Sequence, residues 1–112
     1  MRESPLLDRE RVLELLESYE PLLTEKQKEA IDGYYRYDLS LSEISEEKGT
    51  SRAAVNDTLK KTIAKLEDYE RKLRFVEKKK QWKAKAEAIA LLPKEEQAEQ
   101  YRALNEEITH GI

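Results

Sequence analysis

Apolar residues recur every three or four positions along most of this chain, and no stretch alternates apolar and polar residues as a half-buried strand does. This pattern predicts an all-α fold. Prolines and one glycine divide the apolar stripes into helices of about 8–20, 24–37, 40–48, 51–76 and 93–108, with a basic helix between the last two. The expected inward residues are Val12, Leu13, Leu16 and Tyr19 in the first helix, Ala30, Ile31, Tyr34 and Tyr35 in the second, and Ala98, Tyr101, Leu104 and Ile108 in the last.

A tight turn at Gly49 joins two of the predicted helices. Ser40 and Glu43 have the spacing of a capping box, which starts the first helix. Gly49 stands where that helix has to stop, a position that commonly requires positive φ. Thr50 or Ser51 then caps the second helix. Two helices meeting at such a turn predict a helix-turn-helix, and the alternative is an ordinary helical corner in a bundle.

The second helix of this motif would read nucleic acid if the motif is functional. Arg52 and Asn56 would reach base edges, and Ala53 could touch a thymine methyl group. Phosphates would be held by Ser51, Lys60 and Lys61. The acidic residues nearby oppose strong binding to a duplex, because phosphates repel them. They are Asp57 on the same face and Glu43, Glu46 and Glu47 on the preceding helix.

Several short blocks between residues 22 and 73 resemble the YlxM family of small helix-turn-helix proteins from Gram-positive bacteria and their wall-less relatives. The blocks are Leu-Thr-Glu-Lys-Gln at 23–27, the paired Tyr34 and Tyr35, Asp38-x-Ser40-Leu41-x-Glu43-Ile44, Ser51-Arg52-x-Ala54-Val55 and Leu66-x-x-Tyr69-Glu70. The resemblance implies a helix-turn-helix bundle similar to the promoter-reading domain of sigma factors, frequent dimerisation and a regulatory link to the signal recognition particle. The partners it suggests are DNA, the RNA or the protein subunit of that particle, and a second copy of the chain.

A heptad seam runs through the second helix of the motif and beyond it. Its members are Val55, Leu59, Thr62, Leu66, Tyr69, Leu73 and Val76. The seam predicts one helix of roughly 39 Å, longer than a small bundle covers. Its dimer contacts would be Leu59, Leu66, Tyr69, Leu73 and Val76, unless the N-terminal helices fold back along it. We therefore expect a helix-turn-helix domain at 1–74 and a helical extension at 75–112 that packs on the long helix or on a dimer partner.

Basic residues gather in and after this long helix. Residues 61–90 carry ten Lys or Arg against five Asp or Glu, although the whole chain has a net charge of −3. The candidates for contact with RNA phosphates or an acidic protein are Arg74, Lys78, Lys79, Lys80 and Lys83, with Trp82 to stack on a base. Trp82 could equally anchor the C-terminal helices while the lysines solvate their outer face. A second apolar stripe, out of phase with the seam, runs through Phe75, Trp82, Ala86 and Ile89, which indicates a break or a helix serving two surfaces.

Catalysis is poorly supported by the residues available. The chain has no cysteine and one histidine, His110, and its carboxylates are spaced as on solvated helix faces. We expect no enzyme activity, no metal and no cofactor. The N-terminal residues lack the apolar core of a signal peptide, and the longest apolar run, AIALL, is too short to span a bilayer. The sequence therefore predicts a cytoplasmic regulator that binds nucleic acid, with a purely protein-binding dimer module as the alternative.

Overall fold

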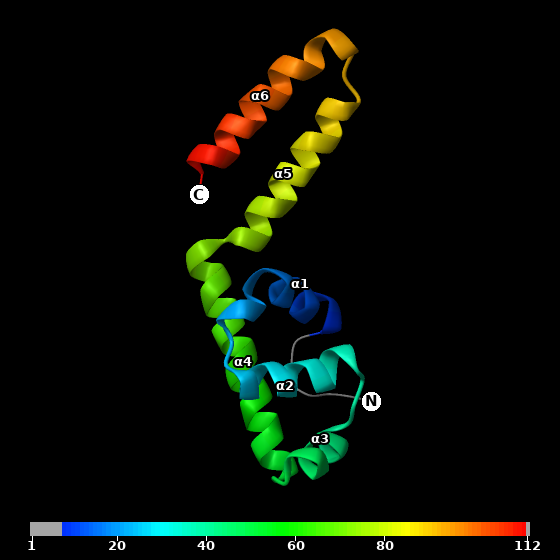
Figure 1. Ribbon diagram of the computed structural model, residues 1–112, viewed down its shortest axis with the longest axis vertical. Helices are drawn as coiled ribbons and strands as arrows, with labels where there is room; N and C mark the ends of the chain where they lie inside the picture. The colour runs from blue at the N-terminus through cyan, green and yellow to red at the C-terminus, as the bar shows by residue number, and fades with distance from the viewer. Residues whose placement is uncertain (1–7, 112) are drawn as a thin grey trace. The chain divides into compact units, whose positions relative to one another are not determined.

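The computed structural model describes residues 8–111, and within this range every regular element is a helix (Figure 1). The all-α prediction is confirmed. The elements are α1 (Arg9–Tyr19), a 3-10 turn (Glu20–Leu22), α2 (Glu25–Ile31), a π-helical turn (Asp32–Arg36), α3 (Leu41–Lys48), α4 (Arg52–Leu73), α5 (Phe75–Ala90) and α6 (Lys94–His110). The chain divides into two compact units, Met1–Arg74 and Phe75–Ile112. No helix in the described range is both long and apolar enough to cross a membrane.

Helix α4 is the element on which the first unit is built. Helices α1, α2 and α3 all pack against it, as Figure 1 shows. The side chains that fill this core are Val12, Leu15, Leu16, Tyr19, Ala30, Ile31, Tyr35, Ile44, Val55, Leu59, Ile63 and Leu66. The N-terminal helices therefore fold back along the seam of α4. In α1 the predicted Val12, Leu16 and Tyr19 are fully buried, and so is Leu15, which was not predicted, whereas the predicted Leu13 is only half-buried.

The helix starts follow the capping residues of the sequence. Asp8 accepts a hydrogen bond from the Arg11 amide at the start of α1. The capping box predicted for α3 is present at Ser40, and a second capping box starts α2 at Thr24. Each cap supplies an acceptor to an amide that has no partner within its helix, so these starts are fixed by local chemistry.

The second predicted helix is interrupted. Helix α2 ends at Ile31, and the chain widens into the π-helical turn, which buries Tyr35 and leaves Tyr34 half-buried. Gly33 lies in this turn, where an added Cβ would come 3.4 Å from the Ile44 side chain. The turn thus packs against α3 at a distance where an added Cβ would make ordinary van der Waals contact.

The prediction of one helix continuing to Val76 is wrong. Helix α4 ends at Leu73, and Arg74 adopts a left-handed conformation with φ 58°. The Arg74 amide donates to the Glu70 carbonyl at 2.8 Å, which closes the last turn. The break lies where the out-of-phase apolar stripe of the following helix begins, and α5 starts at Phe75.

The second unit is a hairpin of α5 and α6. Ile89 and Leu104 are buried in it, and Ile108 is half-buried. Ala98 and Tyr101, which the sequence predicted to face inward, are exposed, because a single partner helix covers only a narrow stripe of α6. Pro93 is the N-cap of α6 with ψ 147°, so the helix begins at Lys94, one residue after the predicted start.

Candidate nucleic-acid interface

The turn between α3 and α4 has the geometry that the sequence predicted. Gly49 has φ 66° and ψ 36°, and the Thr50 amide donates to the Ser45 carbonyl at 3.0 Å. Ser51 caps α4, and its hydroxyl accepts from the Ala54 amide at 3.0 Å. The chain thus leaves α3 and enters α4 within three residues, which is the arrangement of a helix-turn-helix.

Lys48 and Thr50 stand beside the glycine, where such motifs usually carry apolar residues. Both line a pocket of about 310 Å³ whose other walls come from α2, α3 and α4. Lys48 also forms an ion pair with Glu29 of α2. The corner is therefore open on this side, and the ion pair accounts for the charged residue at position 48.

The first turns of α4 present the predicted contact residues on one side, which we call the recognition face. It consists of Ser51, Arg52, Ala53, Asn56, Asp57, Lys60 and Lys61, all exposed except the half-buried Asn56. Val55 and Leu59 are buried on the opposite side. Within residues 8–111, the side chains of Arg52, Asn56 and Lys60 make no hydrogen bond or ion pair. These three groups are therefore available to a ligand.

The acidic residues that oppose duplex binding differ in whether their carboxylates have partners within the protein. Asp57 forms an ion pair with Lys61, with 3.1 Å between Oδ2 and Nζ. The Glu43 carboxylate accepts from the Ser40 amide at 2.8 Å as part of the capping box. Glu46 and Glu47 are exposed. Two carboxylates near the recognition face are thus partly satisfied within the protein.

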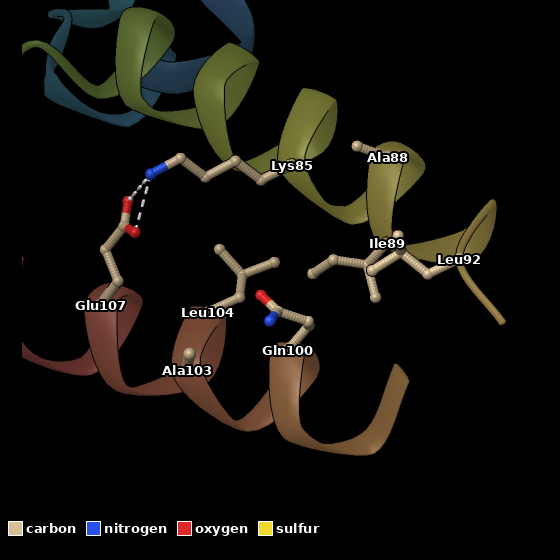
Figure 2. Close-up of a pocket in the computed structure, with 8 residues that line it drawn as sticks. All are labelled: Lys85, Ala88, Ile89, Leu92, Gln100, Ala103, Leu104 and Glu107. Carbon is tan, nitrogen blue, oxygen red and sulfur yellow. Dashed lines mark hydrogen bonds and ion pairs between the residues drawn. The ribbon is translucent and has the colours of Figure 1, made fainter. Parts of the chain in front are cut away.

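The basic residues after α4 do not all form a free surface. Lys78 donates to the Gly111 carbonyl at 2.9 Å, and Lys85 pairs with Glu107 at 2.8 Å (Figure 2). Trp82 is half-buried, and its ring lies next to Gly111. These contacts join α5 to the end of α6. Of the other predicted residues, Arg74 belongs to the first unit, and Lys79, Lys80 and Lys83 are exposed on α5.

Part of the predicted dimer seam is core. Leu59 and Leu66 are fully buried in the first unit, where α1 and α2 cover α4. Tyr69 is half-buried, and its ring centroid lies 5.8 Å from that of Tyr19. Leu73 is 39% exposed, and Val76 is buried in α5. The heptad spacing marks an apolar stripe, but at Leu59 and Leu66 its partners are helices of the same chain.

The sequence did not predict a groove between α5 and α6. It has a volume of about 380 Å³, and Figure 2 shows the side chains around it. Ala88, Ile89, Leu92 and Leu104 form its apolar walls, and the Lys85–Glu107 pair lies at one end. Leu91, next to Leu92 in the sequence, is 87% exposed. The apolar run AIALL, residues 88–92, was the feature of the sequence that could have indicated this groove.

The family model described as "Putative helix-turn-helix protein, YlxM / p13 like" matches residues 6–108. Among similar proteins, a UPF0122 protein of Fusobacterium nucleatum is 48% identical over 69 residues, which cover 62% of this chain and 67% of that protein. A UPF0122 protein of Shouchella clausii is 52% identical over 64 residues, 57% of this chain and 59% of its own length. One of Pediococcus pentosaceus is 54% identical over 66 residues, 59% of this chain and 58% of its own. The matched segments thus span about three fifths of the relatives' length.

Proposed function

Because the chain belongs to the YlxM/p13-like family of helix-turn-helix proteins, we propose that it is a non-enzymatic regulator that binds nucleic acid through the recognition face of α4. The observation that carries this proposal is the free set of Arg52, Asn56 and Lys60 on the exposed side of the first turns of that helix. A guanidinium, a carboxamide and an ammonium at successive turns are the groups that contact base edges and phosphates in the major groove.

The roles follow from the position of each residue along the helix. Arg52 lies in the first turn and Asn56 in the second, so both would reach base edges when the amino end of α4 enters the groove. Lys60 and Lys61 lie further along and would contact phosphates. Ser51 and the exposed Ala53 stand at the amino end, where a phosphate and a thymine methyl group are the matching ligands.

We also propose that the protein is a cytoplasmic homodimer. The hairpin of α5 and α6 exposes Leu91 and Tyr101 and also carries an apolar groove. Two helices with so few buried side chains have little core of their own, and a second copy is a common way to complete one. A dimer would present two recognition faces, which compensates for the modest positive charge of each.

A second candidate ligand is the signal recognition particle, through its RNA or its protein subunit. It is favoured by the exposed Lys79, Lys80 and Lys83, which share one side of α5. Lys78 and Trp82, which we predicted for the same surface, contact the end of α6. This candidate therefore rests on fewer residues than the sequence predicted.

A titration against three ligands separates these possibilities: a pool of mixed duplex DNA, the RNA of the particle, and its protein subunit. Replacing Arg52 and Asn56 with alanine should weaken binding to the duplexes that the wild type selects from this pool by at least about tenfold, since each good bidentate base contact discriminates against the wrong base by roughly 1–3 kcal/mol. Charge reversal at Lys79, Lys80 and Lys83 should leave the duplex titration nearly unchanged. The opposite ranking, with the RNA or the subunit retained most tightly, would favour the second candidate.

Arg102 and Asn105 provide a matched control for the first variant. Both are exposed on α6, and within the described residues neither side chain makes a hydrogen bond or ion pair. Their double replacement with alanine removes the same two side chains from a different surface. If it weakens duplex binding as much as the Arg52 and Asn56 variant does, the recognition face is not the binding surface.

A further inference from the structure

Asp57 is an acidic residue in the middle of the recognition face. Its side chain is 61% exposed and pairs with Lys61, which is 74% exposed, at 3.1 Å. The acid precedes the base by four residues, the favourable order for an ion pair along a helix. Both charged groups therefore lie on the surface that we propose meets nucleic acid.

This pair opposes binding to any duplex in two ways. The Asp57 carboxylate is repelled by the phosphates, and Lys61 is held by Asp57 instead of neutralising a phosphate. A carboxylate on this face is compensated only where it meets a hydrogen-bond donor on the nucleic acid. In the major groove such a donor is an exocyclic amine, and the pairing that suits Asp is the N4 amine of cytosine.

We infer that Asp57 is a specificity-determining residue that favours duplex DNA with cytosine at the position facing it; this inference rests on the proposed function. At such a site the carboxylate turns from Lys61 to the cytosine amine, and Lys61 is released to a phosphate. At other sequences the pair stays closed and withholds one cation from the duplex. Asp57 thus lowers the affinity for most duplex sequences, but not for those with cytosine at the position that faces it.

Replacing Asp57 with Asn tests this inference. The variant keeps the shape of the side chain and frees Lys61 for a phosphate. It should bind a random duplex pool several-fold more tightly at low salt. The plot of log affinity against log salt should become steeper by about 0.9, the contribution of one added phosphate contact. In a selection from a randomised duplex pool, the wild type should enrich cytosine at one position, and the variant should lose that enrichment.

Asp68 offers a matched control in the same helix. It pairs with Lys72 four residues on, also at 3.1 Å, and it contacts Arg71 as well. Asp68→Asn changes the net charge by the same amount near the carboxyl end of α4. The inference predicts no change in cytosine enrichment and a smaller gain in affinity. If both variants gain equally and neither changes the enrichment, the effect is one of net charge and the inference is overturned.

Comparing the Arg52 and Asn56 variant with Asp57→Asn distinguishes a failure of this inference from a failure of the proposed function. If the Arg52 and Asn56 variant loses duplex binding while Asp57→Asn behaves as the wild type, the recognition face binds DNA and only the role of Asp57 is wrong. If no form of the protein, Asp57→Asn included, retains the duplex pool, both are wrong. The inference is supported if Asp57→Asn binds the duplex pool more tightly and loses the cytosine enrichment while Asp68→Asn keeps that enrichment.

Discussion

Position 49 shows how one residue without a side chain sets the corner of the motif. Gly49 has φ 66°, and an added Cβ would meet nothing within 4 Å. A Gly49→Ala variant therefore meets only backbone strain, and we expect a loss of about 1 kcal/mol in the free energy of unfolding, measured with urea. Gly49→Asn should lose less, because asparagine tolerates this conformation. Equal losses would mean that the strain is not the cause.

A buried hydrogen bond connects α1 to the end of α4. Tyr19 is fully buried, and its hydroxyl donates to the buried carboxylate of Glu70. Tyr19→Phe removes this donor at little change in volume, so we expect a loss of about 1.5–3 kcal/mol in unfolding free energy. Tyr101→Phe on α6 is the control, because its ring is 41% exposed, and it should leave the unfolding free energy unchanged. A Tyr19→Phe protein as stable as the wild type would contradict this role.

Glu20 makes the stability depend on pH in the acid range. The Arg36 guanidinium donates two hydrogen bonds of 3.0 Å to it, which lowers the pKa of Glu20 below its ordinary 4.5 although burial opposes the shift. The folded pKa lies below the unfolded one, so the stabilisation is complete above the unfolded pKa and is lost as pH falls through the folded pKa. Glu20→Gln should therefore reduce the loss of unfolding free energy below about pH 4.5.

The control for this titration is Glu47→Gln on α3. Glu47 is exposed, and within residues 8–111 its side chain makes no ion pair. Urea unfolding of the three proteins at several pH values between neutral and about pH 3 makes the comparison. If Glu47→Gln reduces the acid loss as much as Glu20→Gln, the contact with Arg36 is not the source of the pH dependence.

At the scale of single elements, the helix starts could be predicted and some helix ends could not. A cap such as Ser40 or Ser51 acts on amides two or three residues away, so the sequence contains the whole interaction. The end of α4 is different, because Leu73, Arg74 and Phe75 are all acceptable within a helix. What the sequence did show was the change of phase between two apolar stripes, and this change marks the break.

Position 74 provides a test of that break. In a helix interior alanine is more stable than glycine by about 1 kcal/mol. Arg74 has φ 58°, where glycine carries no steric penalty. We therefore expect Arg74→Gly to be more stable than Arg74→Ala by about 1 kcal/mol in urea unfolding. Both variants lose the arginine side chain, so its own contacts cancel in the comparison. The reverse order would indicate a helix that continues through residue 74.

The candidate site was predictable to the extent that it lies on one helix. Arg52, Asn56 and Lys60 are exposed as expected, because Val55 and Leu59 fix the orientation of α4. Heptad spacing alone could not identify the partner of the seam, since a stripe is equally apolar whether its own chain or a second copy covers it. For the same reason the spacing of basic residues did not reveal that Lys78 and Lys85 contact α6.

At the scale of the whole molecule, the two units differ in how much core they contain. The first unit draws at least two buried apolar residues from each of α1, α2 and α4, and more from the turns and α3. The buried apolar residues of the second unit are Val76, Ile89 and Leu104 among the residues that the structure describes. Units of fewer than about 40 residues usually need a partner, a metal or a disulfide to be stable. The hairpin is therefore the part of the chain where we expect association to occur.

Leu91 allows association to be tested without damage to the fold. It is 87% exposed in the turn between α5 and α6, so Leu91→Glu removes almost no contact within the chain. If the hairpin forms the dimer, this variant should change from dimer to monomer in size-exclusion chromatography with light scattering, because burying an unpaired carboxylate is costly. Leu22→Glu, on an exposed leucine of the first unit, is the control and should remain dimeric. A Leu91→Glu protein that stays dimeric would place the interface elsewhere, and a monomeric wild type would refute the dimer itself.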